Sequence, residues 1–368
     1  MEKTYTVTKT QILKIAEKSC RTLMNKFTPP ELPPAMRFHY HQSVFLLGML
    51  RVWEETGNDE YFQYIKGYYD ALIDDEGNFE YDRDQLDAIQ VGILLFKLHE
   101  ETGHKKYMIA ARKLRHIIDT INRTTENGFW HKDKYPYQMW LDGLFMAGPY
   151  LVKYANQFHE KDLIQVVLYQ ERLMRKHMTD PKTGLLFHAW DEKRVQPWAN
   201  KDTGCSPEFW GRSVGWYGTA LIDILEAIGD EYQGQEELPV EVAKYIENVV
   251  KFQDEKTGLW YQVVDKGDQE DNWLESSSSS LYLYTMAKAL HYGFVGKEYE
   301  ENLLRGFSGL LEHMTREDAD GLHVNGICIG TSAGTYEYYV GRPTSEDDLH
   351  GVGAFLLAAM AVYEYLEK

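Results

Sequence analysis

One short loop motif recurs five times along the chain and limits the folds that the chain can form. Each copy has an acidic or polar turn, then a glycine, then an aromatic residue or a leucine, and the copies are centred on Gly77, Gly128, Gly184, Gly258 and Gly321. Successive glycines are 51, 56, 74 and 63 residues apart. This spacing leaves room for two helices and two connections in each unit, so the sequence predicts a series of helical hairpins.

The segments between these loops predict helices of two kinds. Residues 104–121 carry an apolar stripe with basic residues on the other face, which is typical of a helix with one side in water. Residues 86–98 and 139–151 are apolar nearly all round, which is typical of a buried helix. Pro149 indicates a kink or an irregular start in the second of these. Further outer helices are expected near 7–27, 58–73, 160–178, 238–253 and 297–314, and further inner helices near 42–56, 209–228, 276–292 and 348–366.

About twelve helices in six hairpins can close into a ring or open into a solenoid. A solenoid usually has a tighter period and atypical terminal repeats. Here the inner helices are almost wholly apolar, and the loops before them carry the unusual polar residues. The sequence therefore favours an all-α (α/α)6 barrel, formed by a single domain over residues 1–368. A cavity is expected where the glycine loops lead into the inner helices, and short β-like strands are expected only in those loops.

Composition narrows the classes of ligand and the compartment. A net charge of −18 offers no basic surface for nucleic acid, whereas 26 Tyr, 15 Phe and 9 Trp favour a cleft that stacks on sugars. The three cysteines, Cys20, Cys205 and Cys328, cannot complete a disulfide framework and lack metal-ligand spacing. No apolar stretch is long enough for a secretion signal or a membrane span. We therefore expect a cytoplasmic protein with no membrane partner, no metal and no cofactor.

Charged residues interrupt the apolar inner segments near their starts. Asp87, Asp142, Arg212 and Glu275 stand there, and His350 follows a pair of aspartates. Buried charges need a partner or a function, and in a barrel these positions converge on the mouth of the cavity. An isolated aspartate at such a place is more often a helix cap, so each carboxylate could simply be structural.

Asp142 fits the capping interpretation least well. Trp140, Leu141, Leu144 and Phe145 surround it in sequence, and apolar surroundings raise the pKa of a carboxyl group and keep it protonated as a general acid. The cation Arg212 is bracketed by two tryptophans, Trp210 and Trp216, an arrangement suited to holding an anionic sugar. His39 and His41 form an H-x-H pair without a third ligand at zinc-site spacing.

Two longer motifs resemble a known family. The segments Tyr135–Ala147, with Met-Trp-Leu-Asp-Gly at its centre, and Gly204–Tyr217, with Trp-Gly-Arg-Ser-Val-Gly-Trp, resemble the unsaturated rhamnogalacturonyl hydrolases of glycoside hydrolase family 105. Shorter matches include Phe38–Tyr40, Leu86–Gln90, Trp130–Lys132, Phe187–Asp191, Arg342–Ser345 and Asp348–Gly353. The resemblance extends over nearly the whole chain and implies an (α/α)6 barrel.

By this resemblance, Asp142 matches the catalytic acid of the family. The residues that match its substrate pocket are Tyr40, Asp87, His188, Trp210, Arg212 and Trp216. Trp140 and Lys132 join them as expected substrate-binding residues, with Arg212, helped by Lys132, expected to hold the uronate carboxylate. His131 and His350 are additional candidates.

The implied partner is a small unsaturated disaccharide, and the implied reaction is hydration of its C4–C5 vinyl ether. That chemistry needs one acid that can become the base for water, rather than a spaced carboxylate pair. Three alternatives remain open. They are an unsaturated glucuronyl hydrolase acting on glycosaminoglycan fragments, a sugar epimerase with paired histidines, and a non-catalytic sugar-binding or scaffold protein.

Overall fold

The computed structural model describes residues 7–229 and 236–367, and helices occupy all twelve predicted segments. The outer helices are α1 (Lys9–Lys26), α3 (Asp59–Leu72), α6 (Lys105–Arg115), α9 (Asp162–Met178), α11 (Glu237–Val250) and α13 (Glu300–His313). The inner helices are α2 (Tyr40–Thr56), a segment formed by α4 (Asp87–Gln90), a 3-10 turn (Val91–Leu94) and α5 (Leu95–Thr102), then α8 (Gly143–Phe158), α10 (Gly211–Ile228), α12 (Ser276–Tyr292) and α15 (Leu349–Tyr365).

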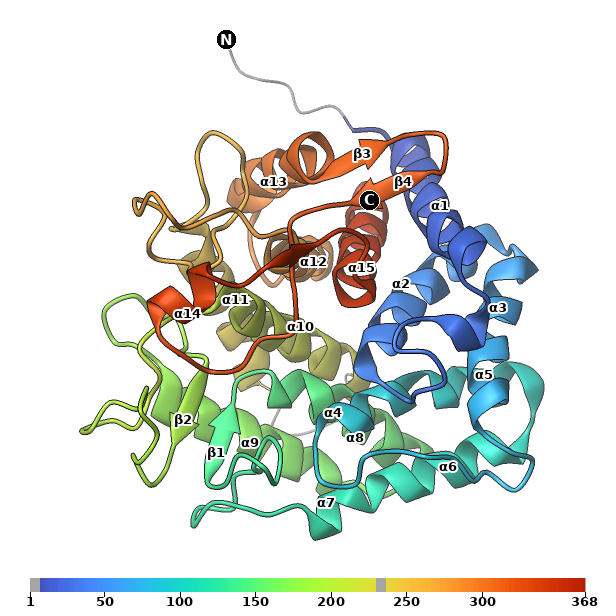
Figure 1. Ribbon diagram of the computed structural model, residues 1–368, viewed down its shortest axis with the longest axis horizontal. Coiled ribbons are helices and arrows are strands. Elements are labelled where there is room, and N and C mark those ends of the chain that lie inside the picture. The colour runs from blue at the N-terminus through green and yellow to red at the C-terminus, as the bar shows by residue number, and fades with distance from the viewer. Residues whose placement is uncertain (1–6, 230–235, 368) are drawn as a thin grey trace.

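The inner helices pack side by side in a closed ring. Contacts run from α2 to the α4 segment, then to α8, α10, α12 and α15, and α15 packs back on α2 (Figure 1). Close packing requires a small residue where α15 meets α2, because a Cβ atom on Gly353 would lie 2.4 Å from the backbone of Val44. The ring confirms the (α/α)6 barrel and excludes the open solenoid.

Each glycine loop follows one outer helix and packs against the next outer helix of the barrel. Gly77, Gly184 and Gly258 lie against residues of α6, α11 and α13 respectively. Gly321 completes the outer layer: it has a φ of +143°, and a Cβ atom there would lie 2.2 Å from Oγ1 of Thr22 in α1. The Thr22 hydroxyl also bonds both backbone groups of Leu322. The last loop motif therefore ties the end of the chain to its first helix.

Two inner segments differ from the sequence prediction. The helix expected over 86–98 is divided by a 3-10 turn, and the Tyr69 hydroxyl donates to the carbonyl of Val91 within that turn. The helix expected over 139–151 begins only at Gly143, because Gln138–Trp140 forms strand β1, which pairs with β2 (Ala189–Asp191). Pro149 lies inside this helix.

The short strands are not confined to the glycine loops. Strands β3 (Thr315–Glu317) and β4 (Leu322–Val324) form a hairpin around the Gly321 loop as expected. Strands β5 (Ile327–Cys328) and β6 (Thr344–Ser345) flank a longer excursion that includes the short helix α14 (Tyr336–Val340). Helix α7 (Ile117–Thr120) continues the outer helix α6. None of the helices described is long and apolar enough to span a bilayer.

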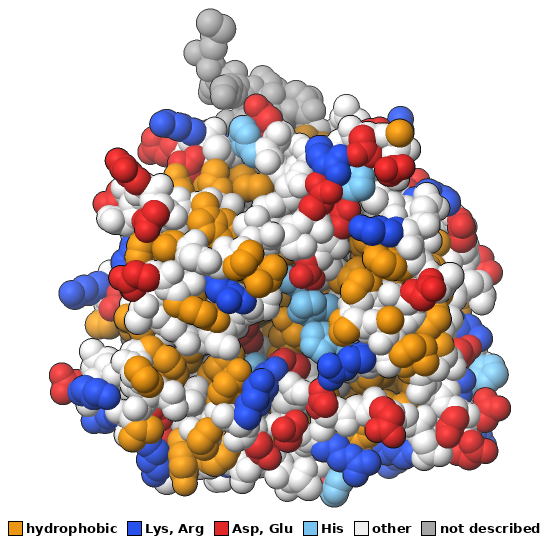
Figure 2. Space-filling model, viewed as in Figure 1, with side chains coloured by type: hydrophobic (Ala, Val, Ile, Leu, Met, Phe, Trp, Pro, Cys, Tyr) orange, Lys and Arg blue, Asp and Glu red, His pale blue; other side chains and the backbone are white. Residues whose placement is uncertain are grey.

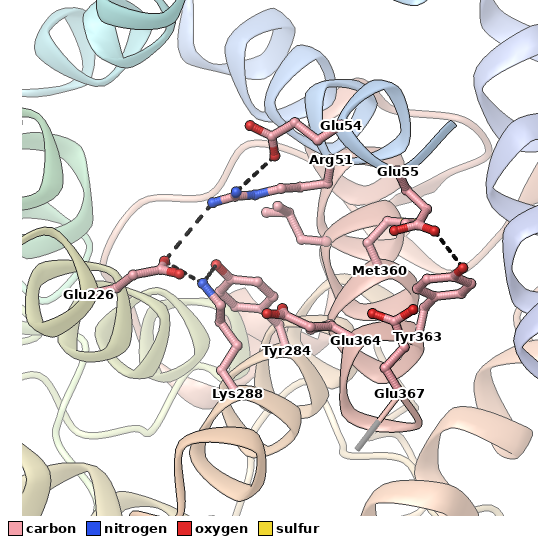
Figure 3. Close-up of a pocket in the computed structure, with 12 residues that line it drawn as sticks. Arg51, Glu54, Glu55, Glu226, Tyr284, Lys288, Met360, Tyr363, Glu364 and Glu367 are labelled. Atoms are coloured by element: carbon pink, nitrogen blue, oxygen red, sulfur yellow. Dashed lines mark hydrogen bonds and ion pairs between the residues drawn. The ribbon is translucent and has the colours of Figure 1, made fainter. Parts of the chain in front are cut away.

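The end of the barrel formed by the last turns of the inner helices carries a network of charges (Figure 3). The Lys288 ammonium lies 2.5 Å from Glu226 and donates to the Tyr284 hydroxyl. Arg51 of α2 pairs with Glu54 at 3.0 Å and reaches Glu226 at 4.0 Å. These ion pairs link α2, α10 and α12 at what we call the base of the barrel.

Candidate active site

A cavity of about 380 Å³ lies at the opposite end, where the inner helices begin. Figure 2 shows a hollow near the middle of this face, with histidine side chains at its edge. The lining residues are His39, Tyr40, His41, Asp87, His131, Lys132, Tyr135, Trp140, Asp142, Met146, Trp210, Arg212, Gly330, Thr331, Ser332, Tyr338 and Arg342.

Most of the residues singled out in the sequence therefore meet in one cavity, although they come from distant hairpins. The predicted residues in its lining are Tyr40, Asp87, His131, Lys132, Trp140, Asp142, Trp210 and Arg212. The remaining three are buried and lie outside the cavity lining, and they are His188, Trp216 and His350.

Asp142 stands at the N-cap position of α8, but its side chain makes no capping hydrogen bond. The strand pairing of β1 with β2 holds its backbone, since Leu141 N–H donates to the carbonyl of His188. Asp142 Oδ2 lies 3.4 Å from Nε2 of His188, and within the described residues neither atom makes a hydrogen bond. The carboxylate is thus placed by its backbone and faced by one histidine.

The prediction that apolar surroundings keep Asp142 protonated is wrong for the free site. Burial does act to raise the pKa of this carboxyl group, but His188 and then His131 outweigh burial, so the pKa of Asp142 lies below its ordinary value. The flanking apolar residues are buried as expected, whereas the two histidines come from elsewhere in the chain.

Asp87 forms a buried ion pair with Lys132 at the cavity wall. Its second oxygen, Oδ1, lies 3.4 Å from Nε2 of His131. Burial acts to raise the pKa of Asp87, but the charges of Lys132 and His131 outweigh burial, so the pKa of this carboxyl group lies below its ordinary value. Burial lowers the pKa of His131 to about 4, and the imidazole is therefore neutral near pH 7.

Arg212 is held differently from the sequence prediction. Its Nη1 donates to the carbonyl of Cys328 at 2.6 Å and its Nη2 donates to that of Ile329 at 2.9 Å. The guanidinium is 1% exposed and lies over the Trp210 ring at 4.5 Å. Two of its N–H donors therefore hold Cys328 of β5 and the residue that follows it, and the expected contact of Arg212 with the uronate carboxylate stays a prediction.

The expected sandwich of Arg212 between two tryptophans is wrong for Trp216. That ring stacks on Phe145 at 4.3 Å and belongs to the apolar core. Trp216 lies four residues beyond Arg212 in α10, about 6 Å farther from the mouth of the barrel. Of the two tryptophans beside Arg212, Trp210 lines the cavity and Trp216 does not.

A cluster of two histidines and an aspartate, formed by His41, Asp348 and His350, adjoins the cavity. His41 Nδ1 and His350 Nδ1 lie 3.2 and 2.8 Å from the same Asp348 oxygen, and His350 Nε2 donates to the Cys328 carbonyl. The ligand atoms of the three residues lie within 4.8 Å of one another. Burial acts to raise the pKa of Asp348, and His350 and His41 lower it well below its usual range. The partners of His41 were not recognised in the sequence, because they lie about 300 residues away in it.

The segment between β5 and β6 supplies the part of the wall that the sequence did not predict. Thr331, Ser332, Tyr338 and Arg342 line the cavity, and the Tyr135 and Ser332 hydroxyls lie 3.4 Å apart across it. Arg342 also lies over the Tyr338 ring. The segment lacks helical periodicity, and its only sequence signals were its tyrosines and the Arg-Pro-Thr-Ser motif.

The fold agrees with the comparisons with known proteins. A family model described as Glycosyl Hydrolase Family 88 matches residues 15–366. A solved family 105 glycoside hydrolase from C. acetobutylicum ATCC 824 is 33% identical, covers 96% of this chain and 100% of its own, and superposes with a TM-score of 0.90. The chain belongs to glycosyl hydrolase family 88/105.

Two more distant relatives of this family member carry names that describe activities. Unsaturated rhamnogalacturonyl hydrolase YesR of Bacillus subtilis (strain 168) is 26% identical over 295 residues and covers 78% of each chain. The unsaturated glucuronyl hydrolase of Bacillus sp. GL1 is 12% identical, covers 96% of each chain and has a TM-score of 0.73. The second likeness shows the shared fold alone.

Proposed function

We propose that this family 88/105 protein hydrolyses disaccharides in which a 4-deoxy-4,5-unsaturated galacturonyl residue is linked to rhamnose. The observation that carries the proposal is Asp142, a carboxylate in the cavity wall that makes no capping bond and lies 3.4 Å from His188. The 26% identity to a rhamnogalacturonyl hydrolase and the 33% identity to a family 105 structure support the choice of sugar.

The reaction proceeds by hydration of the double bond. Asp142 gives a proton to C4, and positive charge develops at C5, where the ring oxygen stabilises it. Water adds at C5 and returns a proton to Asp142, so the same carboxyl group serves as acid and then as base. The resulting hemiketal opens to a 5-keto sugar, and the hemiacetal at C1 then releases rhamnose.

Asp142 must gain a proton before it can act as the acid. The incoming sugar carries a carboxylate, and a like charge close to Asp142 raises the pKa of its carboxyl group. Substrate binding would thus supply the shift that the apolar surroundings alone do not. This argument assigns the acid form of Asp142 to the enzyme–substrate complex.

The other cavity residues receive binding roles. Lys132 has two N–H donors left after it bonds Asp87, so we assign to it the main contact with the uronate, with Arg212 in support. Asp87 would accept hydrogen bonds from sugar hydroxyls. Tyr40 and the Trp140 and Trp210 rings would pack on the apolar faces of the sugars.

Replacement of the acid tests the reaction. Asp142→Asn should lower turnover of the unsaturated disaccharide by at least about 100-fold, measured as loss of the ultraviolet absorbance of the vinyl ether. Asp84→Asn is a matched control, because Asp84 is exposed and lies outside the cavity lining. Turnover by Asp142→Asn near the wild-type rate would refute the assignment.

A substrate panel tests the choice of sugar. Rhamnose-linked unsaturated disaccharides should be consumed faster than hexosamine-linked ones, and the reverse order would favour a glucuronyl hydrolase. Binding without consumption of either would favour a sugar-binding protein. The cytoplasmic location stays a prediction, and cell fractionation would test it.

A further inference from the structure

Tyr339 lies behind the cavity wall and contacts the histidine that faces Asp142. It comes from the short helix α14, and its side chain is fully buried beside Trp210, with the two rings nearly parallel at 6.1 Å. Its hydroxyl oxygen lies 2.7 Å from Nδ1 of His188. The mechanism above does not use this tyrosine.

The direction of this hydrogen bond follows from the other partner of the hydroxyl. The backbone N–H of Gly334 donates to the Tyr339 oxygen at 3.1 Å, and a backbone N–H can act only as a donor. Burial raises the pKa of Tyr339 well above its ordinary value, so the phenol keeps its hydrogen. A phenol has a single O–H to donate. Among the described residues, the acceptor within hydrogen-bond distance of that hydrogen is Nδ1 of His188.

An Nδ1 atom that accepts a hydrogen bond leaves the imidazole proton on Nε2. Nε2 is the atom that lies 3.4 Å from Asp142 Oδ2. The His188 ring is itself fixed between Trp140, at 5.2 Å, and Trp210, at 4.6 Å. The chain of donors therefore runs from Gly334 through Tyr339 and His188 to one oxygen of Asp142.

We propose that Tyr339 is a positioning residue that holds His188 in its Nε2–H tautomer, so that the imidazole donates to Oδ2 of Asp142 and leaves Oδ1 for proton exchange. The same segment places Ser332 and Tyr338 in the cavity lining. The position of this segment therefore also determines whether His188 can donate to Asp142. The tautomer does not depend on the reaction, whereas its catalytic consequence rests on the proposed function.

Nitrogen NMR of the wild-type protein tests the tautomer directly. Two-bond ¹⁵N–¹H correlations distinguish a protonated Nε2 from a protonated Nδ1, and the His188 signals are assigned by their loss in His188→Gln. We expect protonated Nε2 and unprotonated Nδ1 at neutral pH. Protonated Nδ1 with bare Nε2 would overturn the proposal, even if the enzyme turns over the disaccharide as proposed.

Tyr339→Phe then tests the positioning role. It keeps the ring and removes the donor, so the Nε2–H form should no longer dominate in the spectrum and kcat should fall roughly 10-fold with KM little changed. Tyr336→Phe is the matched control on the same helix, because its hydroxyl bonds Asp271 away from the cavity. An unchanged His188 spectrum in a folded Tyr339→Phe variant would overturn the proposal. If no unsaturated disaccharide is consumed by the wild type, the proposed function fails while the spectrum still decides the tautomer.

Discussion

Removal of Lys132 should expose how much the Asp87–Lys132 pair contributes to stability. The Asp87 and Lys132 side chains are 10% and 17% exposed. In Lys132→Met the carboxylate would keep only the contact with His131, whose pKa of about 4 leaves it neutral near pH 7. Loss of one member of a buried ion pair costs about 3–5 kcal/mol. We expect the lower end, about 3 kcal/mol, because Lys132 reaches the cavity and its charge is partly solvated.

A double-mutant cycle measures the coupling within the pair. Urea unfolding of the wild type, Lys132→Met, Asp87→Asn and the double variant gives the four free energies of unfolding. The double variant contains no unpaired charge at this place, so it should be less destabilised than the sum of the single variants, with a coupling of about 2 kcal/mol.

The pH dependence supplies an independent check. The folded-state pKa of Asp87 lies below its ordinary value, so its stabilisation is present above the unfolded pKa and is lost as the pH falls through the folded pKa. In Lys132→Met the ammonium no longer opposes burial, so the pKa of Asp87 rises, the unpaired carboxylate takes up a proton, and the stability gap between the wild type and the variant should shrink as the pH is lowered toward 4. Additive single-variant effects, or a gap that does not change with pH, would refute the reasoning.

Two further predictions concern the histidines and the closure of the ring. Burial lowers the pKa values of His41 and His131 to about 4, so the unfolded chain binds protons at these histidines more readily than the folded protein does. The free energy of unfolding should therefore fall as the pH drops from 6.5 to 4, and the loss between pH 7 and pH 5 should be about 2 kcal/mol for each histidine. Equal urea midpoints at pH 7 and pH 5 would contradict this. Gly321→Ala should lower the free energy of unfolding by about 1–3 kcal/mol, since φ is +143° and the new Cβ atom would meet Thr22. Gly330→Ala is its control, because a Cβ atom there has open space, and equal melting temperatures for the two variants would show that the Gly321 contact is dispensable.

The helices could be predicted from the sequence, because the periodicity of apolar residues that indicates a helix is a local pattern. Every predicted helical segment has a counterpart in the barrel, and the division of 86–98 by a 3-10 turn involves Tyr69, a residue of the outer helix α3 that lies 22 residues before Val91. The segment that contains Tyr338 and Tyr339 was not predicted, since its conformation depends on contacts with distant residues such as Tyr135 and Arg212 rather than on a local pattern.

The cavity residues were predicted better than their electrostatics. Charges at the starts of apolar helices pointed to Asp87, Asp142 and Arg212, and they line one cavity. The pKa of Asp142 was predicted in the wrong direction, because His131 and His188 stand 11 and 46 residues from it in sequence. Residues that are close in sequence indicate whether a carboxyl group is buried, whereas residues that are close in space determine whether it is charged.

The charge network of Arg51, Glu226 and Lys288 at the base has a consequence for traffic through the barrel. The cavity lies at the mouth, the tightly packed inner helices fill the middle, and the ion pairs link the far ends of these helices. A sugar that enters the mouth must leave by the same route. Under the proposed function, a polymer could not be threaded through the ring, so the enzyme would be suited to short chains or chain ends, with each product departing before the next molecule arrives.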